Sequence, residues 1–227
     1  VVDISSGVAD FVGYGEATVT VSFDGESDTI DLDIKMATEE ADDSDDYFLN
    51  SDDGFDDDFA ADGGYGYSSF PSIVYGIPVG DLVDIVSFGT GGELTIHLNG
   101  YEIVDGPGAD FIIFENTLGS WLELAEVAVS ENGTDFYTFD CDVDDFAGGY
   151  EGCAGVNEVN YSYSTSDMRD PDLAGGDAFD LADLGISRIE YIKITDLETC
   201  EYDGYLCDTG TIGFDLDAIS IVNGVNE

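Results

Sequence analysis

The sequence predicts an all-β protein: an antiparallel β-sandwich or jelly roll with long acidic loops and at most one short helix. Three observations carry this prediction. Apolar and polar residues alternate over many short segments, as they do in half-buried strands. Glycine and aspartate fill the stretches between those segments and favour turns there. Helical spacing of apolar residues is almost missing, which argues against a parallel α/β fold, because successive parallel strands need a crossover that is usually a helix.

The N-terminal part predicts a β-hairpin. Residues 15–23 (GEATVTVSF) alternate, and residues 29–36 (TIDLDIKM) alternate strictly between apolar and polar side chains. The turn-forming residues DGES lie between the two segments. Residues 1–23 as a whole allow two interpretations: an arm that adds a strand to a neighbouring subunit, or a strand within the protein's own sheet.

Residues 39–69 predict an acidic loop inserted between strands. The stretch 39–62 carries 12 acids in 24 positions and no base. Every second position from 50 to 58 carries one of the residues Asn50, Asp52, Gly54, Asp56 and Asp58. This spacing partly matches calcium loops, although the glutamate that closes such loops is missing. Two interpretations stay open, an ordered calcium loop and a solvated, disordered one.

From residue 70 the sequence predicts a regular series of short strands, within one domain that spans 1–227. The predicted strands are 71–75, 83–88, 92–98, 110–115, 122–130, 135–140, 188–195 and 214–222. Asn132-Gly133 predicts a two-residue hairpin turn. Only residues 177–184 (DAFDLADL) have a helical pattern, and they amount to one or two turns.

Charge is the most unusual property of the composition. The chain holds 52 acidic and 4 basic residues, for a formal net charge of -48. Such a domain repels itself unless bound cations or screening salt offset the repulsion. The acids comprise 36 aspartates and 16 glutamates, and because aspartate is a common calcium ligand, we expect Ca²⁺ rather than adaptation to high salt alone. The lack of a basic patch argues against nucleic acid as a partner.

Three acidic clusters beside glycines, at predicted strand ends, are the candidate metal sites. Calcium takes roughly six to eight oxygen ligands, and bent loops supply carboxylates together with carbonyls. The candidate ligands are Asp105, Asp110, Glu115 and Asn116 in the first cluster, Asp177 and Asp180 in the second, and Asp215 and Asp217 in the third. The alternative for each cluster is an exposed turn carboxylate.

The four cysteines predict two disulfides, Cys141–Cys153 and Cys200–Cys207, against the alternative of free thiols in a cytosolic protein. Disulfides indicate an oxidising compartment, so we expect a secreted or cell-surface protein. The start at Val1 fits a chain from which a signal peptide has been removed. No apolar run is long enough to span a membrane.

Catalytic motifs are missing from the sequence, and we expect a protein that is not an enzyme. There is no GxSxG, Walker loop or HExxH motif, and a pair of carboxylates is no signal of a hydrolase among 52 acids. Aromatic residues suggest a stacking platform for sugars, with the hydrophobic core as the alternative place for them. They are Trp121, Tyr101, Tyr161 and Tyr163.

Five stretches between residues 70 and 223 carry a family resemblance. They are VDGPGADFIIFEN, LAEVAVSENGTDFYTF, AGGDAFDLADLG, RIEYIKITD and GFDLDAISIVN. In this order they resemble poorly characterised secreted and cell-surface proteins of myxobacteria and related bacteria. YIKITD and FDLDAISIV also resemble the last strands of galactose-binding-like jelly rolls, and that resemblance implies a structural calcium bound at Asp217. Residues 1–69 lie outside it.

Taken together, the sequence predicts a calcium-stabilised extracellular structural protein of a cell surface, matrix or filament that associates with itself. The alternative is a calcium-dependent carbohydrate-binding module, whose partner is a glycan. A carboxylate-based hydrolase is the weakest of the three hypotheses.

Overall fold

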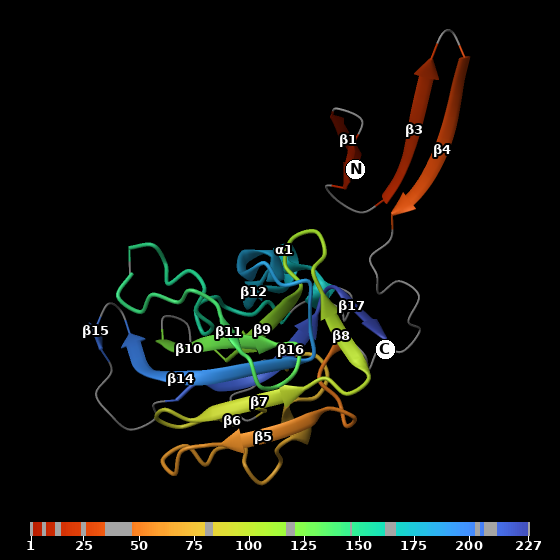
Figure 1. Ribbon diagram of the computed structural model, residues 1–227. Coiled ribbons are helices and arrows are strands. Elements are labelled where there is room, and N and C mark those ends of the chain that lie inside the picture. Colours follow the sequence, from red (N-terminus) through yellow and green to blue (C-terminus); the bar gives the residue numbers. More distant parts are fainter. Residues whose placement is uncertain are drawn as a thin grey trace. The chain divides into compact units, whose positions relative to one another are not determined.

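The computed structural model describes the ranges 2–5, 8–11, 15–23, 26–34, 47–79, 84–116, 121–145, 147–161, 167–202, 205–206 and 213–226. Within them the chain is nearly all antiparallel β-sheet (Figure 1). It divides into two compact units, Val1–Asp42 and Asp43–Glu227. The single domain that the sequence predicts over residues 1–227 stays a prediction.

Two antiparallel pairs make up the N-terminal unit. Strand β1 (Val2–Ser5) pairs with β2 (Val8–Phe11), and β3 (Gly15–Phe23) pairs with β4 (Glu26–Ile34). The predicted hairpin is therefore confirmed, with its second strand at Glu26–Ile34 rather than at 29–36. Among the described strands, these four pair only with one another.

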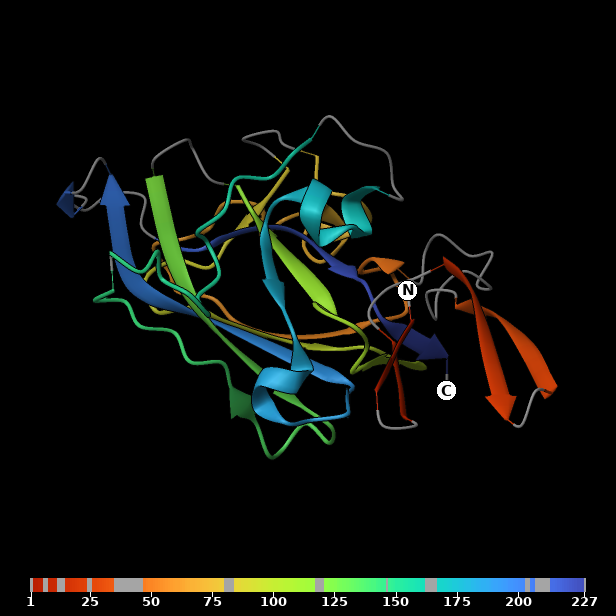
Figure 2. The ribbon, with the colours of Figure 1, turned by 90° about the horizontal axis from the view of Figure 1, so that it is seen from above.

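Three sheets make up the larger unit. The first has the order β11-β10-β14-β7-β5, with β15 also paired to β14. Its strands are β5 (Gly54–Asp58), β7 (Glu93–His97), β10 (Trp121–Ser130), β11 (Tyr137–Thr138), β14 (Tyr191–Tyr202) and β15 (Tyr205–Leu206). Its two long strands, β10 and β14, lie side by side in Figure 2.

The second sheet has the order β12-β9-β16-β6, and the third the order β13-β8-β17. The strands of the second are β6 (Val86–Ser87), β9 (Phe111–Glu115), β12 (Asp177–Phe179) and β16 (Asp215–Ile221). Those of the third are β8 (Tyr101–Val104), β13 (Arg188–Ile189) and β17 (Gly224–Asn226).

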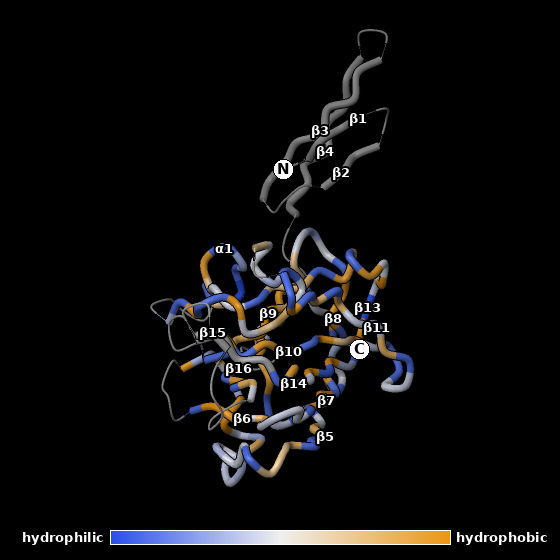
Figure 3. The backbone as a smooth tube through the Cα atoms, turned by 90° about the vertical axis from the view of Figure 1, so that its left-hand side faces the viewer, coloured by the Kyte–Doolittle hydropathy of each residue, from blue (hydrophilic) through white to orange (hydrophobic). Residues whose placement is uncertain are grey.

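The hydrophobic core joins the first two sheets into a β-sandwich. Ile96, Val127 and Ile194 of the first sheet belong to the same buried cluster as Ile113 and Leu216 of the second. Alternate residues of β7 are buried, as expected for a strand with one face on the core, whereas every residue of β9 is buried. Figure 3 shows hydrophobic residues within these strands and hydrophilic ones in the loop near β11. Each large side chain in this core contributes roughly 1.5–3 kcal/mol to stability.

Two segments differ from the sequence prediction. The predicted strand at 71–75 contains a 3₁₀ helix, Ser72–Val74. The predicted helix at 177–184 splits, because its first residues pair with β9 as strand β12 and only Leu181–Leu184 forms a 3₁₀ turn. Sheet pairing has overridden the local helical pattern here.

Short helices complete the larger unit. A 3₁₀ helix spans Asp167–Arg169, and α1 (Pro171–Ala174) is the one α-helix among the described residues. Asp170 caps α1 by accepting a hydrogen bond from the Asp172 amide. No helix in the described ranges is long and apolar enough to cross a membrane.

Part of the predicted acidic loop at 39–69 is ordered as the edge strand β5. It pairs with β7, and Phe55 and Phe59 pack against the core. Asp56 and Asp58 are exposed, and charges on an edge strand discourage pairing with other chains. The apolar residues within the acidic stretch thus anchor it to the sandwich.

Candidate metal centres

Asp105, Asp110 and Asp180 form a cluster that could hold a metal ion. Asp105 follows β8, Asp110 precedes β9, and Asp180 follows β12, which pairs with β9. One carboxylate oxygen of each lies within 4.8 Å of the other two. Asp105 is exposed, Asp180 is half-buried and Asp110 is buried. The cluster combines residues from two of the three predicted acidic segments.

Asp110 is also a structural hydrogen-bond acceptor. Its Oδ1 accepts from the Gly106 amide and from Asn223 Nδ2, both at 2.8 Å, and its Oδ2 accepts from the Leu181 amide at 2.8 Å. Burial raises the pKa of Asp110, and these hydrogen bonds oppose the shift. Asp110 therefore ties three loops together with or without an ion.

Four carboxylates lie close enough to Glu115 for their charges to act on it, and a fifth acts on one of those four, Asp215. We call these six residues the acidic core end. They are Glu115, Glu123, Asp177, Asp196, Asp215 and Asp217. Five of the six are buried, and Asp215 is half-buried. The sequence analysis named four of them as candidate ligands but placed them in three separate clusters.

Glu115 has the least compensated carboxylate of the acidic core end. It ends β9 with 1% of its surface exposed, and its Oε2 has no hydrogen-bond partner. Burial raises the pKa of Glu115 well above its ordinary value, and the charges of Asp215, Glu123, Asp177 and Asp217 raise it further. The neighbouring residue Asn116 is buried as well.

Asp177 is nearly as buried as Glu115, but its carboxylate accepts four hydrogen bonds. Its carboxylate accepts from the backbone amides of Gly155, Val156 and Asn157 at 2.7, 3.1 and 3.1 Å, and from Asn157 Nδ2 at 2.8 Å. Burial raises the pKa of Asp177 to about 6 despite these donors. The metal-ligand role that the sequence predicts for Asp177 stays a prediction.

Asp215 and Asp217 lie at a bulge in β16. Leu216 pairs with Glu115 and Ala218 pairs with Phe114, so Asp217 is the extra residue between two successive pairs. Asp217 Oδ1 accepts from the Val79 amide at 3.1 Å, and the carboxylate also hydrogen-bonds Tyr161. Burial raises the pKa of Asp215 to about 6.

Sequence reasoning missed Glu123 and Asp196. Asp196 accepts hydrogen bonds from the amides of Gly91, Glu198 and Phe214 at 2.8, 3.0 and 3.0 Å, and Glu123 Oε1 accepts from the Gly213 amide at 3.2 Å. A signal was present in the strand pattern. Asp196 continues the inward-facing positions of Ile192 and Ile194, so an acid stands where the next apolar residue would be.

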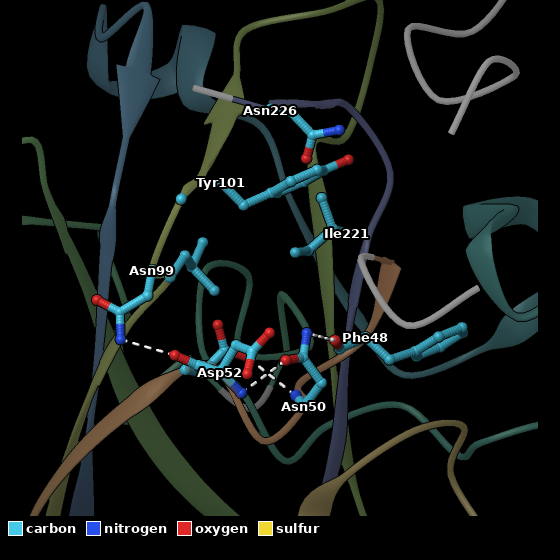
Figure 4. A pocket seen from close by; sticks show the side chains of 10 residues that line it. Phe48, Asn50, Asp52, Asn99, Tyr101, Ile221 and Asn226 are labelled. Carbon is cyan, nitrogen blue, oxygen red and sulfur yellow. Dashed lines mark hydrogen bonds between the residues drawn. The ribbon is translucent and has the colours of Figure 1, made fainter. Parts of the chain in front are cut away.

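The predicted ligands of the acidic loop are not brought together. Asp52 lines a small cavity of about 40 Å³, whereas Asp56 and Asp58 lie on the exposed edge of β5. Figure 4 shows Asn50, Asp52 and Asn99 linked by hydrogen bonds on one side of this cavity, with Tyr101 on the other. Burial raises the pKa of the neighbouring Asp53 to about 6.

A second group of acids lines a surface groove beside the disulfide. The groove has a volume of about 580 Å³, and its acidic residues are Asp140, Asp142, Asp145, Glu151 and Asp183. Two of them act in turns, because Asp142 Oδ1 accepts from the Asp144 amide and Asp145 Oδ1 from the Gly148 amide. Turn formation accounts for these two carboxylates without a ligand.

The Cys141–Cys153 disulfide is confirmed, with an S–S distance of 2.02 Å. Cys207 and the side chain of Cys200 lie outside the described residues, and so do Tyr163 and the side chain of Trp121. Of the predicted aromatic platform, Tyr161 is 39% exposed and Tyr101 is buried in the core.

Basic side chains in the described ranges pair mostly with surface acids. Lys193 contacts Glu93 at 2.8 Å and Arg188 contacts Glu102 at 3.0 Å. Arg169 donates to the backbone carbonyls of Ile221 and Val222 and lies over the Tyr47 ring.

Comparison with known proteins finds little. No family model matches the chain, and no curated protein matches it. Two solved structures from Clostridium perfringens align at 10% identity: the module CpGH89CBM32-6, with TM-score 0.36 over 76% of this chain and 94% of that one, and CpGH89 in complex with GlcNAc-alpha-1,4-galactose, with TM-score 0.33 over 78% and 14%. Similarity this low carries no argument about function.

Proposed function

We propose that this protein is a calcium-stabilised structural component of an extracellular surface, matrix or filament. The observation that carries the proposal is the Asp105–Asp110–Asp180 cluster, in which three carboxylates lie within 4.8 Å of one another. Like charges this close repel one another unless they are protonated or share a cation. Calcium suits the cluster because it binds carboxylate oxygens from bent loops.

The disulfide and the charge support an extracellular location and a need for cations. Disulfides persist mainly in oxidising compartments, and Cys141–Cys153 is formed. Extracellular calcium is plentiful enough for sites of modest affinity. A formal net charge of -48 also makes cation binding favourable for the folded state.

Self-association is proposed through the N-terminal strands. Strands β1–β4 form two-stranded pairs, and among the described strands they pair with no others. A two-stranded hairpin is marginally stable alone, and its edges offer unpaired amides and carbonyls to a further strand. Strand addition between copies of the chain satisfies these groups. Deleting residues 1–12 should reduce the assembly seen by analytical ultracentrifugation, and unchanged assembly would refute this role.

Calcium dependence is tested by thermal unfolding in low salt, with and without EDTA. An ion that binds only the folded form adds about 2.7 kcal/mol when its concentration is 100 times Kd. We expect EDTA to lower the Tm of the wild type, and D105N/D180N to have lost most of that response. Asp183→Asn is the matched control, since Asp183 is an exposed acid three residues beyond Asp180. An EDTA response that is equal in all three proteins rules out this cluster as the site.

A second candidate function, calcium-dependent glycan binding, rests on Tyr161. Tyr161 is 39% exposed, and it hydrogen-bonds Asp217 of the acidic core end. An aromatic ring beside a bound cation is a suitable surface for stacking a sugar. A glycan array with calcium present, repeated with Tyr161→Ala, tests this function. Binding that is absent, or the same in the variant, removes it.

A further inference from the structure

We propose that the acidic core end is a second cation site, with Glu115 at its centre and calcium as its ion. The site is distinct from the Asp105–Asp110–Asp180 cluster and shares no residue with it. It deepens the proposed function and rests on it only for the identity of the ion.

The position of Glu115 places a carboxylate between the two sheets. Phe111 and Ile113 belong to the buried core, and Glu115 takes the next position on the same face of β9. In the facing sheet, Glu123 stands in the same row of β10 as the core residues Ala125 and Val127, with a bulge between Glu123 and Ala125. Carboxylates therefore enter the end of the sandwich from both layers.

One oxygen of the Glu115 carboxylate has no donor that would stabilise its charge. Its Oε2 is buried without a hydrogen-bond partner, and a buried polar atom left in this state costs about 1–3 kcal/mol, or more when it is charged. Asp177, on the neighbouring strand, receives four hydrogen bonds. The fold thus supplies donors to one buried acid and leaves the other open.

The charges that act on Glu115 are those of other acids. Four carboxylates raise its pKa, with Asp215 the strongest. Lys193 and Arg188 are engaged with Glu93 and Glu102 instead. A bound cation would offset the repulsion among these acids and would also give Oε2 a partner.

The geometry favours calcium over magnesium. In the described part of the chain, only the Asp105 cluster brings three carboxylate oxygens within 4.8 Å of one another. An ion at Glu115 must therefore take backbone carbonyls or waters beside its carboxylates. Calcium accepts such irregular, high-coordination shells, whereas magnesium demands a compact octahedron.

Calcium counting by equilibrium dialysis and isothermal titration tests the inference on the full chain. We expect Glu115→Gln to bind one calcium ion fewer than the wild type, and D105N/D180N to lose a different one. Glu126→Gln, a half-buried glutamate of β10 outside the acidic core end, is the matched control and should bind as the wild type does. If Glu115→Gln binds as many ions as the wild type, the inference is overturned, and Glu115 is a neutral core residue.

Stability measurements separate loss of the ion from damage to the fold. In EDTA, Glu115→Gln should be at least as stable as the wild type, because a neutral amide removes the repulsion. In calcium, its Tm should rise by less. A variant that is equally destabilised with and without calcium contradicts the site. Should Glu115→Gln fail to fold, Asp215→Asn at a half-buried position is the substitute, with a calcium affinity expected to fall about tenfold and an unchanged affinity counting against the proposal.

The two proposals fail in different ways. If only D105N/D180N loses an ion, the inference about Glu115 is wrong and the proposed function stands. If only Glu115→Gln loses one, the Asp105 cluster is not the calcium site and the acidic core end is.

Discussion

Asp177 and Glu115 stand on neighbouring strands of one sheet, both nearly inaccessible to solvent, at 3% and 1% exposure. Asp177 accepts four hydrogen bonds, three of them from consecutive backbone amides. Glu115 Oε2 accepts none. A buried acidic side chain is therefore a candidate metal ligand when the surrounding backbone leaves its carboxylate without hydrogen-bond donors. Acidity and burial alone do not distinguish the two residues.

The largest expected loss of stability follows substitution of Asp177, the buried acid that accepts four hydrogen bonds. Asp177→Asn places an amide group against donors, and we expect it to lower the free energy of unfolding by about 4 kcal/mol, as when one partner of a buried charged network is removed. Glu115→Gln, measured in the same EDTA buffer, should change that free energy by less than about 0.5 kcal/mol. Urea unfolding curves give both values. If both variants lose the same free energy of unfolding, hydrogen bonding does not distinguish Asp177 from Glu115.

Removal of the Cys141–Cys153 disulfide should cause the second-largest loss of stability. Cys141–Cys153 closes a short loop, and its removal should cost about 3 kcal/mol. Cys153 lies two residues before Gly155, whose amide donates to Asp177. Asp177→Asn should therefore cost less in the C141S/C153S background, with a coupling of about 1 kcal/mol in a double-mutant cycle. Strict additivity would show that the disulfide does not hold these amides in place.

A pH titration of the metal-free protein should show a smaller effect. The pKa values of Asp177 and Asp215 are raised from 3.8 to about 6 in the folded state. Between these values the folded state binds more protons than the unfolded state, so stability falls as pH rises from about 4 to 6. Asp215→Asn should flatten this slope when unfolding is followed across the range in EDTA. A slope of the opposite sign contradicts the raised pKa values.

The smallest effect should come from a surface pair. Arg188 contacts Glu102 at 3.0 Å, with 58% of the arginine side chain exposed. We expect Glu102→Gln to change the free energy of unfolding by about 0.5 kcal/mol or less, and less still in high salt. A cost as large as that of Asp177→Asn would mean that burial is not what separates strong carboxylates from weak ones here.

Much of the fold was predictable from local patterns. The hairpin at 15–34 and strands β7, β10, β14 and β16 follow the alternation of apolar residues, and β9 follows an unbroken apolar run. The pattern failed where tertiary pairing decided the outcome, as at residues 177–179, which pair with β9. It also failed for β8, which was not predicted, and for the predicted strand at 71–75, which contains a 3₁₀ helix.

The candidate sites were predictable as residues but not as groups. Three sequence clusters become two in space, since Asp105 and Asp110 join Asp180, while Glu115 joins the acids of β16. Contacts between distant strands decide this grouping, and sequence spacing does not record them. Glu123 and Asp196 were missed because neither stands beside a glycine, as the predicted clusters do. Glu115, Glu123 and Asp196 share another signal, an acid on the apolar face of a strand.

Gly155 links the two kinds of buried acid through simple geometry. Its backbone has φ +85°, and a Cβ atom there would collide with the Glu123 backbone carbonyl. Its amide meanwhile donates to Asp177. Any side chain at position 155 would push the loop at residues 155–157, whose amides donate to Asp177, away from β10. The spacing between the loop that neutralises one carboxylate and the strand that carries another is thus set by the absence of a single methyl group.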